Sequence, residues 1–202
     1  MSGVPILVEA RDVRVLVVGG GTVAARKARA LAEAGAAVRV VSPAAADEIC
    51  EMARDGVLEL VSRTFVAGDV LDAQLVIAAT NDRATNAAVA AEARGAHRLV
   101  NVVDAPEEGS FATMATHRTG ALVVGVSAGG VPAGATRVRD AIAARFDERY
   151  GRALASLAAV RRELLDRGES ERWHALAGEV LGATFCDAVE TDGVEAKVSA
   201  WR

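Results

Sequence analysis

The sequence predicts an α/β fold: a doubly wound parallel sheet, then a small α+β dimerisation domain and a helical C-terminal segment. Three observations support this. Short apolar runs rich in β-branched residues alternate with Ala-rich helical stretches through the first half of the chain. Hydrophobic residues make up 51% of the 202 residues, enough for a buried core. Beyond residue 109, two strand-like runs follow each other without an intervening helix, and helical spacing then continues.

The first half of the chain supplies the elements of the sheet. The run from Val13 to Val18 is too apolar for an exposed edge, so we expect a central parallel strand there. Gly35 lies where the first helix should end, and Ser42-Pro43 should stop the second strand. The expected strands are 13–18, 38–41, 58–65, 75–79 and 99–103, and the expected helices are 22–34, 44–54 and 82–94.

The second half has a different pattern. Residues 110–116 and 121–127 resemble two strands joined at Arg118-Thr119-Gly120, and a helix is expected over 138–150, with its start near Gly134. Apolar residues keep helical spacing from Arg152 onward, with a further helix over 172–181. We therefore predict a nucleotide-binding domain over 1–109, a dimerisation and substrate domain over 110–150, and a helical segment over 151–202.

Composition excludes several classes of function. The chain has 23 Lys and Arg against 27 Asp and Glu, and 3% aromatic residues, which argues against a nucleic-acid-binding protein. The longest uncharged stretch, 121–136, is too short and too rich in Gly to span a membrane. No secretory signal is expected at the N-terminus. Two distant cysteines and three scattered histidines predict no disulfide and no metal cage, and a cytoplasmic location is expected.

A glycine-rich loop follows the first strand. Gly19-Gly20-Gly21-Thr22-Val23-Ala24 fits the G-x-G-x-x-G/A pattern of Rossmann-type dinucleotide sites, directly before the first helix. Gly19 permits the tight turn, Gly21 lets the backbone approach a pyrophosphate, and Ala24 allows close packing of helix and strand. The alternative is a glycine-rich turn without a ligand. The strand–loop–helix context favours a dinucleotide.

The second strand does not end in the usual acidic residue. Val40-Val41-Ser42-Pro43 stands there, and Arg39 precedes it. The carboxylate that binds the adenosine ribose of NAD is therefore missing, and no negative charge excludes the 2′-phosphate of NADP. The residues alone leave the choice between NAD and NADP open.

Other candidate residues follow later strands. Asp104, just after the last parallel strand, is a candidate general acid or base, or an Asx-turn residue before Pro106. Thr80-Asn81 should face the cofactor cleft, or else cap the following helix. Ser127 suits a hydrogen bond to substrate or a turn. Arg137 and Arg139 lie at the head of a helix, either in a binding site or on a solvated face.

Several motifs occur in the order of a known family. They are Pro5-Ile6, the glycine loop with Arg26-Lys27-Ala28, Ala78-Ala79-Thr80-Asn81-Asp82, Asn101-Val102-Val103-Asp104, Ser110-Phe111 and Ser127-x-Gly129-Gly130. Together they resemble the siroheme synthase amino-terminal family, over about residues 3 to 145. Some members carry a fused methyltransferase domain that these 202 residues do not include, so we expect the stand-alone form.

The resemblance implies an activity. It implies NAD-dependent oxidation of precorrin-2 to sirohydrochlorin, with Fe(II) insertion in bifunctional members, and a homodimer. Asp104 matches the family aspartate implicated in both activities, while Thr22-Val23 and Pro43-Ala44 match its cofactor-contacting positions. Because the substrate is a polycarboxylate, we expect Arg118, Arg137 and Arg139 to bind it.

Two departures from the family pattern concern the substrate half. The usual second serine of Ser-Ser-Gly-Gly is Ala128 here, and the usual Met-Pro after Ser-Phe is replaced around Thr113-Met114. These changes leave chelatase activity undecided. The alternatives are a dehydrogenase without chelatase activity and a non-catalytic nucleotide-sensing domain.

Overall fold

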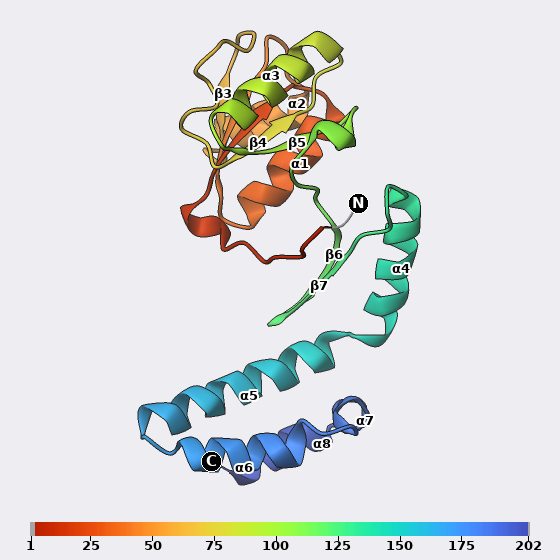
Figure 1. Ribbon diagram of the computed structural model, residues 1–202. Helices are drawn as coiled ribbons and strands as arrows, with labels where there is room; N and C mark the ends of the chain where they lie inside the picture. The colour runs from red at the N-terminus through yellow and green to blue at the C-terminus, as the bar shows by residue number, and fades with distance from the viewer. Residues whose placement is uncertain (1–2, 202) are drawn as a thin grey trace. The chain divides into compact units, whose positions relative to one another are not determined.

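The computed structural model describes residues 3–201, which form two compact units. The first unit extends to Thr113, and the second begins at Met114. Figure 1 shows the sheet with its helices in the first unit, and a hairpin followed by helices in the second.

The first unit contains a five-stranded, wholly parallel sheet. Its strands, in spatial order, are β3 (Glu59–Val61), β2 (Ala37–Val41), β1 (Arg14–Val18), β4 (Leu75–Ala78) and β5 (Leu99–Val102). Its helices are α1 (Thr22–Glu33), α2 (Asp47–Arg54) and α3 (Arg83–Gly95), and the short 3-10 turns are η1 (Ala10–Asp12) and η2 (Pro106–Glu108). The doubly wound order confirms the predicted fold class.

Alternate side chains of the strands form two hydrophobic clusters, one on each face. Val15 and Val17 of β1 pack with α1 and α2, whereas Leu16 and Val18 pack with α3. The helices lie on opposite faces of the sheet in Figure 1. Both faces are thus covered, which leaves the carboxyl ends of the strands as the edge where a ligand binds in such sheets.

The connection from β3 to β4 differs from a regular strand–helix alternation. The strand expected over 58–65 is only Glu59–Val61. The chain then forms turns in which Arg63 holds Asp69 through two bonds of 2.8 and 2.7 Å, and this ion pair lowers the pKa of Asp69. No helix covers the sheet in this connection. The fully buried Val70 packs instead with α3 in the hydrophobic cluster on that face of the sheet.

The hairpin of the second unit is shifted relative to the prediction. Its strands are β6 (Ala115–Thr119) and β7 (Leu122–Val126), and Thr119 pairs with Leu122 across a two-residue loop. Gly120 takes a φ of +53° in that loop, which glycine accommodates readily. The expected strand over 110–116 is wrong. The backbone amide of Ser110 instead donates to the carbonyl of Val100 in β5, at 2.7 Å, and the first strand of the hairpin begins only at Ala115.

The helix expected over 138–150 is two helices. They are α4 (Pro132–Arg145) and α5 (Glu148–Asp166). Asp147 caps α5 by accepting the amide of Arg149 at 2.9 Å, and His117 Nε2 lies 2.6 Å from the carbonyl of Phe146. The joint is therefore held by a cap and by a contact from β6, features that helical periodicity does not reveal.

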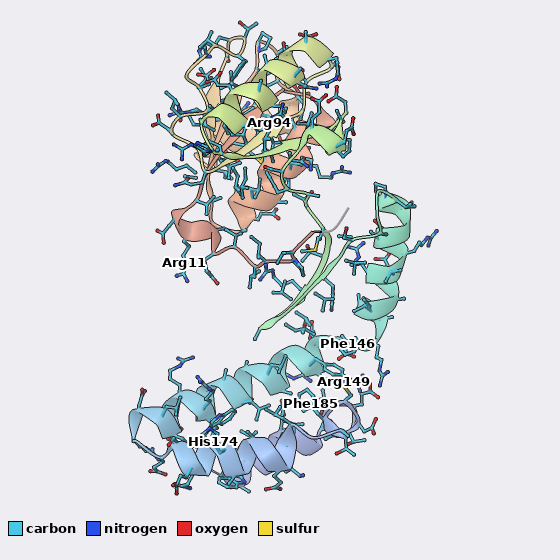
Figure 2. The ribbon with its side chains drawn as sticks, in the orientation of Figure 1. Arg11, Arg94, Phe146, Arg149, His174 and Phe185 are labelled. Carbon is cyan, nitrogen blue, oxygen red and sulfur yellow. The ribbon has the colours of Figure 1, made fainter. Side chains whose placement is uncertain are left out.

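The C-terminal residues form a helical cluster. The helices α6 (Ser170–Val180), α7 (Phe185–Glu190) and α8 (Gly193–Ala200) pack on α5 around buried Tyr150, Leu157 and Leu176. Figure 2 marks Phe146 and Arg149 near the start of α5, and Phe185 at the start of α7. Tyr150 donates its hydroxyl to Glu190 at 2.9 Å, and burial raises the pKa of Tyr150 to about 12. Over residues 3–201, no helix is long and apolar enough to cross a membrane.

Candidate functional site

The glycine loop is packed between the ends of neighbouring strands. Gly19 has a φ of +129°, and a Cβ there would lie 2.3 Å from the carbonyl oxygen of Ala79. A Cβ on Gly20 would lie 2.0 Å from the carbonyl oxygen of Ala44. Both positions exclude any side chain, so the close approach of the loop to the residues after β2 and β4 requires these two glycines.

Gly21 differs from its two neighbours. It is exposed, its φ is −81°, and a Cβ there would meet nothing within 4 Å. It occupies the N-cap position of α1 and has no side chain with which to cap the first amides of Thr22 and Val23. Uncapped amides and the positive end of the helix dipole form an anion site, so this space fits the pyrophosphate of a dinucleotide.

The segment after β2 completes one side of the loop. The buried Ser42 donates its hydroxyl to the carbonyl of Ala44 at 2.7 Å, and Ala46 donates its amide to Gly20 at 2.8 Å. Ser42 therefore shapes this segment, and the exposed Pro43 and Ala44 present its surface. Arg39 is paired with Glu59 at 2.8 Å and does not belong to the loop.

The turn between β4 and α3 is held by its own polar groups. Asp82 caps α3 by accepting the amides of Ala84 and Thr85, which together with the Thr85 hydroxyl lower the pKa of Asp82. Thr80 Oγ1 lies 2.9 Å from the carbonyl oxygen of Asp82, and Asn81 is exposed. The helix cap is therefore Asp82, and Thr80 and Asn81 remain at the carboxyl edge of the sheet.

Asp104 lies at the same edge, immediately beyond β5. Its carboxylate is exposed, and Oδ1 accepts a hydrogen bond of 3.0 Å from Nδ2 of Asn86 on α3. The segment that follows is held by Arg94, marked in Figure 2, which donates to the carbonyl of Glu108 at 2.6 Å. A carboxylate fixed in this way can accept a proton from a substrate placed beside it.

Lys27 is a further polar group of α1. It is partly buried, and its Nζ donates to Oγ1 of Thr113 at 3.1 Å. Burial lowers the pKa of Lys27 from its ordinary value, and the nearby Arg26 lowers it further. This bond ties the start of the glycine-loop helix to the end of the first unit.

Comparison with known proteins identifies the first unit. NAD_binding_7, a family of NAD(P)-binding domains, matches residues 6–115, more than half of the chain. The chain belongs to this NAD(P)-binding family. The open space at Gly21, at the N-terminus of α1, is the part of the structure that fits the pyrophosphate of such a nucleotide.

Whole-protein relatives extend the comparison. The chain is 43% identical over 160 residues to a siroheme synthase of Pseudomonas putida, and 43% identical over 164 residues to one of Methylococcus capsulatus. These matches cover 79% and 81% of this chain, which spans 34% of the length of either relative. A solved structure of SirC, a precorrin-2 dehydrogenase, matches with a TM-score of 0.78 and 26% identity, over 98% of this chain and 100% of that one. The resemblance to the siroheme synthase amino-terminal family is confirmed.

The expected site residues fall into two groups. One group lies around the glycine loop, at the carboxyl edge of the sheet: Gly19, Gly20, Gly21, Thr22, Val23, Ser42, Pro43, Ala44, Thr80, Asn81 and Asp104. The other group belongs to the second unit: Arg118 on β6, Ser127 just after β7, and Arg137 and Arg139 on α4. Arg118 lies within a strand rather than at the hairpin turn, because the turn is at Gly120.

Two further polar residues of the first unit were not identified as site residues from the sequence. Asn86 and Lys27 contact, respectively, Asp104 and Thr113. Asn86 had one signal, since an Asn inside an Ala-rich helix is unfavourable there unless its amide has a specific partner. Lys27 stands in the Arg26-Lys27-Ala28 motif of the family resemblance, but its residue type gave no signal, because lysine is an ordinary helix residue.

Proposed function

We propose that this protein oxidises precorrin-2 to sirohydrochlorin, with NAD⁺ as the hydride acceptor. The observation that carries the proposal is the placement of Gly21 and Asp104 at one edge of one sheet: an open anion site on a helix N-terminus, and an exposed, oriented carboxylate. The full-length likeness to SirC supports the same substrate.

The residues of the chain have separate roles in this proposal. Bound NAD⁺ supplies the hydride acceptor. The amides of Thr22 and Val23 bind its pyrophosphate, and Pro43 and Ala44 contact its adenosine half. Asp104 accepts the proton that leaves the macrocycle, and Thr80 and Asn81 line the same edge. General-base assistance of this kind contributes about 10²–10⁴-fold in rate.

We infer that NAD is preferred over NADP. The residues after β2, from Ser42 to Ala46, include no Arg or Lys that could bind a 2′-phosphate, and Arg39 is already paired with Glu59. The test is steady-state oxidation of precorrin-2 with each nucleotide. A kcat/KM at least about tenfold higher with NAD⁺ supports the preference, and a tenfold advantage for NADP⁺ contradicts it.

The four candidates of the second unit are proposed to bind the carboxylates of the substrate. Arg118 and Arg137 are exposed, and Arg139 lies 2.7 Å from Asp140. Guanidinium groups bind carboxylates with two hydrogen bonds, and Ser127 can add a neutral donor.

Removing these three charges gives a test. The triple Ala variant at Arg118, Arg137 and Arg139 is expected to raise the KM for precorrin-2 by about tenfold or more and to flatten its dependence on ionic strength. The KM for NAD⁺ should not change. The control, which removes two exposed charges from α5, is Arg161→Ala together with Arg162→Ala. A wild-type KM of the triple variant at low salt would place the carboxylate site elsewhere.

Iron insertion is a separate proposal. Asp104 can also accept pyrrole protons as Fe(II), the substrate metal, enters sirohydrochlorin. No group of three His, Cys, Asp or Glu residues suited to a metal ion occurs within residues 3–201, so Asp104 carries this proposal alone. An anaerobic assay with supplied sirohydrochlorin decides it: no acceleration over the uncatalysed rate would leave the dehydrogenase only.

We propose two further properties. The family resemblance supports a homodimer, which sedimentation or light scattering tests. The cysteine pattern supports a cytoplasmic location, since Cys50 and Cys186 are both free thiols. The competing function, a nucleotide-sensing domain, predicts nucleotide binding without turnover of precorrin-2.

A further inference from the structure

One polar side chain in the interior of the first unit has no role in the function described so far. Asn86 lies in the second turn of α3 and is fully buried, with 0% exposure. It is one of three buried polar residues in the described chain, and burying an amide is unfavourable unless its hydrogen bonds are made. Its partners therefore explain its presence.

The amide of Asn86 uses both its donors and its acceptor. Nδ2 donates to the carbonyl of Thr80 and to Oδ1 of Asp104, each at 3.0 Å. Oδ1 accepts the backbone amide of Thr80 at 3.1 Å and lies 2.8 Å from Thr80 Oγ1. The orientation of the amide is fixed by these partners, because a backbone N–H only donates and a carboxylate only accepts.

We propose that Asn86 is a positioning residue for Asp104. The buried amide holds one carboxylate oxygen from the protein side, and because Asp104 is exposed, its other oxygen is left for the reacting group. The same amide holds Thr80, so one side chain fixes the carboxylate relative to the turn after β4. The inference rests on the proposed function, in which Asp104 is the base.

A role in folding accounts for the contacts of Asn86 with Thr80, because these bonds satisfy the backbone N–H and carbonyl of the turn after β4. It does not account for the donor aimed at Asp104, because an exposed carboxylate can be hydrated by water without it. The feature specific to Asn is a donor aimed at Asp104 and an acceptor aimed at Thr80. A substitution that removes Nδ2 and keeps Oδ1 loses the bonds to Asp104 and to the Thr80 carbonyl but keeps the acceptor for the Thr80 amide.

The test compares Asn86→Asp with Asn86→Ala. Asn86→Asp keeps the size and the acceptor toward Thr80 but replaces the donor with a second carboxyl beside Asp104. Two adjacent carboxyls disfavour each other's ionisation. We therefore expect the acid limb of the plot of kcat against pH to shift to higher pH by about 1 unit. Arg83 on α3 lies close enough to Asp104 for their charges to interact, and Arg83 also interacts with Glu107 and Glu108 in η2; all three residues are unchanged in these variants.

Asn86→Ala removes the donor without adding a carboxyl, so the acid limb should move up less than in Asn86→Asp while kcat falls. We expect kcat to fall at least about tenfold in both variants, with the Kd for NAD⁺ within about threefold of the wild type. The control is Asp82→Ala, which removes the cap of α3 and is expected to lower the melting temperature without moving the pH profile. Wild-type kcat in Asn86→Ala, or an unmoved acid limb in Asn86→Asp, would overturn the proposal.

A measurement without turnover separates this inference from the proposed function. The carboxyl ¹³C resonance of Asp104, followed against pH in labelled protein, should show a midpoint at least about half a pH unit higher in Asn86→Asp than in the wild type. If that midpoint moves but the wild-type protein does not oxidise precorrin-2, the contact is real and the proposed function fails. If the midpoint does not move, the positioning proposal fails whatever the activity.

Discussion

Asp104→Asn is expected to lower the rate of NADH production from precorrin-2 by at least about 100-fold. The substitution keeps the shape of the side chain and the acceptor oxygen that Asn86 holds, but it removes the base that takes up the substrate proton. The Kd for NAD⁺ should stay within about threefold of the wild type, because the pyrophosphate site is at the start of α1. Stopped-flow or steady-state kinetics and calorimetric titration measure the two quantities.

Glu107→Gln is the matched control for this prediction. Glu107 is an exposed carboxylate in η2, three residues from Asp104, and the proposal gives it no role. Its removal should leave kcat within about threefold. Oxidation at the wild-type rate by Asp104→Asn would remove Asp104 from the reaction, and equal losses in both variants would indicate a nonspecific effect of charge.

Gly21→Asp is expected to weaken NAD⁺ binding by at least about 100-fold while leaving the fold intact. A carboxylate at the N-cap would occupy the anion site and repel the pyrophosphate, and like charges placed together cost several kcal/mol, where about 1.4 kcal/mol is tenfold in affinity. A Cβ at Gly21 meets nothing within 4 Å, and Asp is a favourable N-cap residue, so α1 should not be destabilised. Calorimetry and thermal unfolding check both expectations.

Neighbouring and distant glycines are the controls for Gly21→Asp. Gly20→Ala places a methyl group 2.0 Å from the carbonyl oxygen of Ala44 and should cost about 1–3 kcal/mol of unfolding free energy. Gly182→Asp adds the same charge in the second unit, where a Cβ also meets nothing within 4 Å, and should leave NAD⁺ affinity unchanged. Wild-type affinity in Gly21→Asp would contradict the nucleotide site.

Most of the first unit could be predicted from local sequence. The β-branched runs around Val17 and Ile77 and the Ala-rich helix after Gly21 give the period of each element directly. The glycine loop was predictable because its three glycines stand between a strand and a helix. The position of Asp104 followed from the rule that residues after parallel strands share one edge.

Other features depend on contacts between distant residues. The break between α4 and α5 depends on a cap by Asp147 and a contact from His117. The shift of the hairpin depends on the hydrogen bond that holds Ser110 beside β5. The partner of Asn86 is 18 residues away along the chain. Periodicity describes one element at a time, so it cannot show these contacts.

The oxidation of precorrin-2 by the purified protein alone tests the central claim most directly. Precorrin-2 and NAD⁺ are incubated with the protein under anaerobic conditions, and NADH and sirohydrochlorin are followed together by absorbance. The account predicts that both products appear in equal amounts, at a rate proportional to enzyme concentration, and that Asp104→Asn abolishes most of this rate. Binding of NAD⁺ without formation of either product would contradict the account and would indicate a nucleotide-sensing domain.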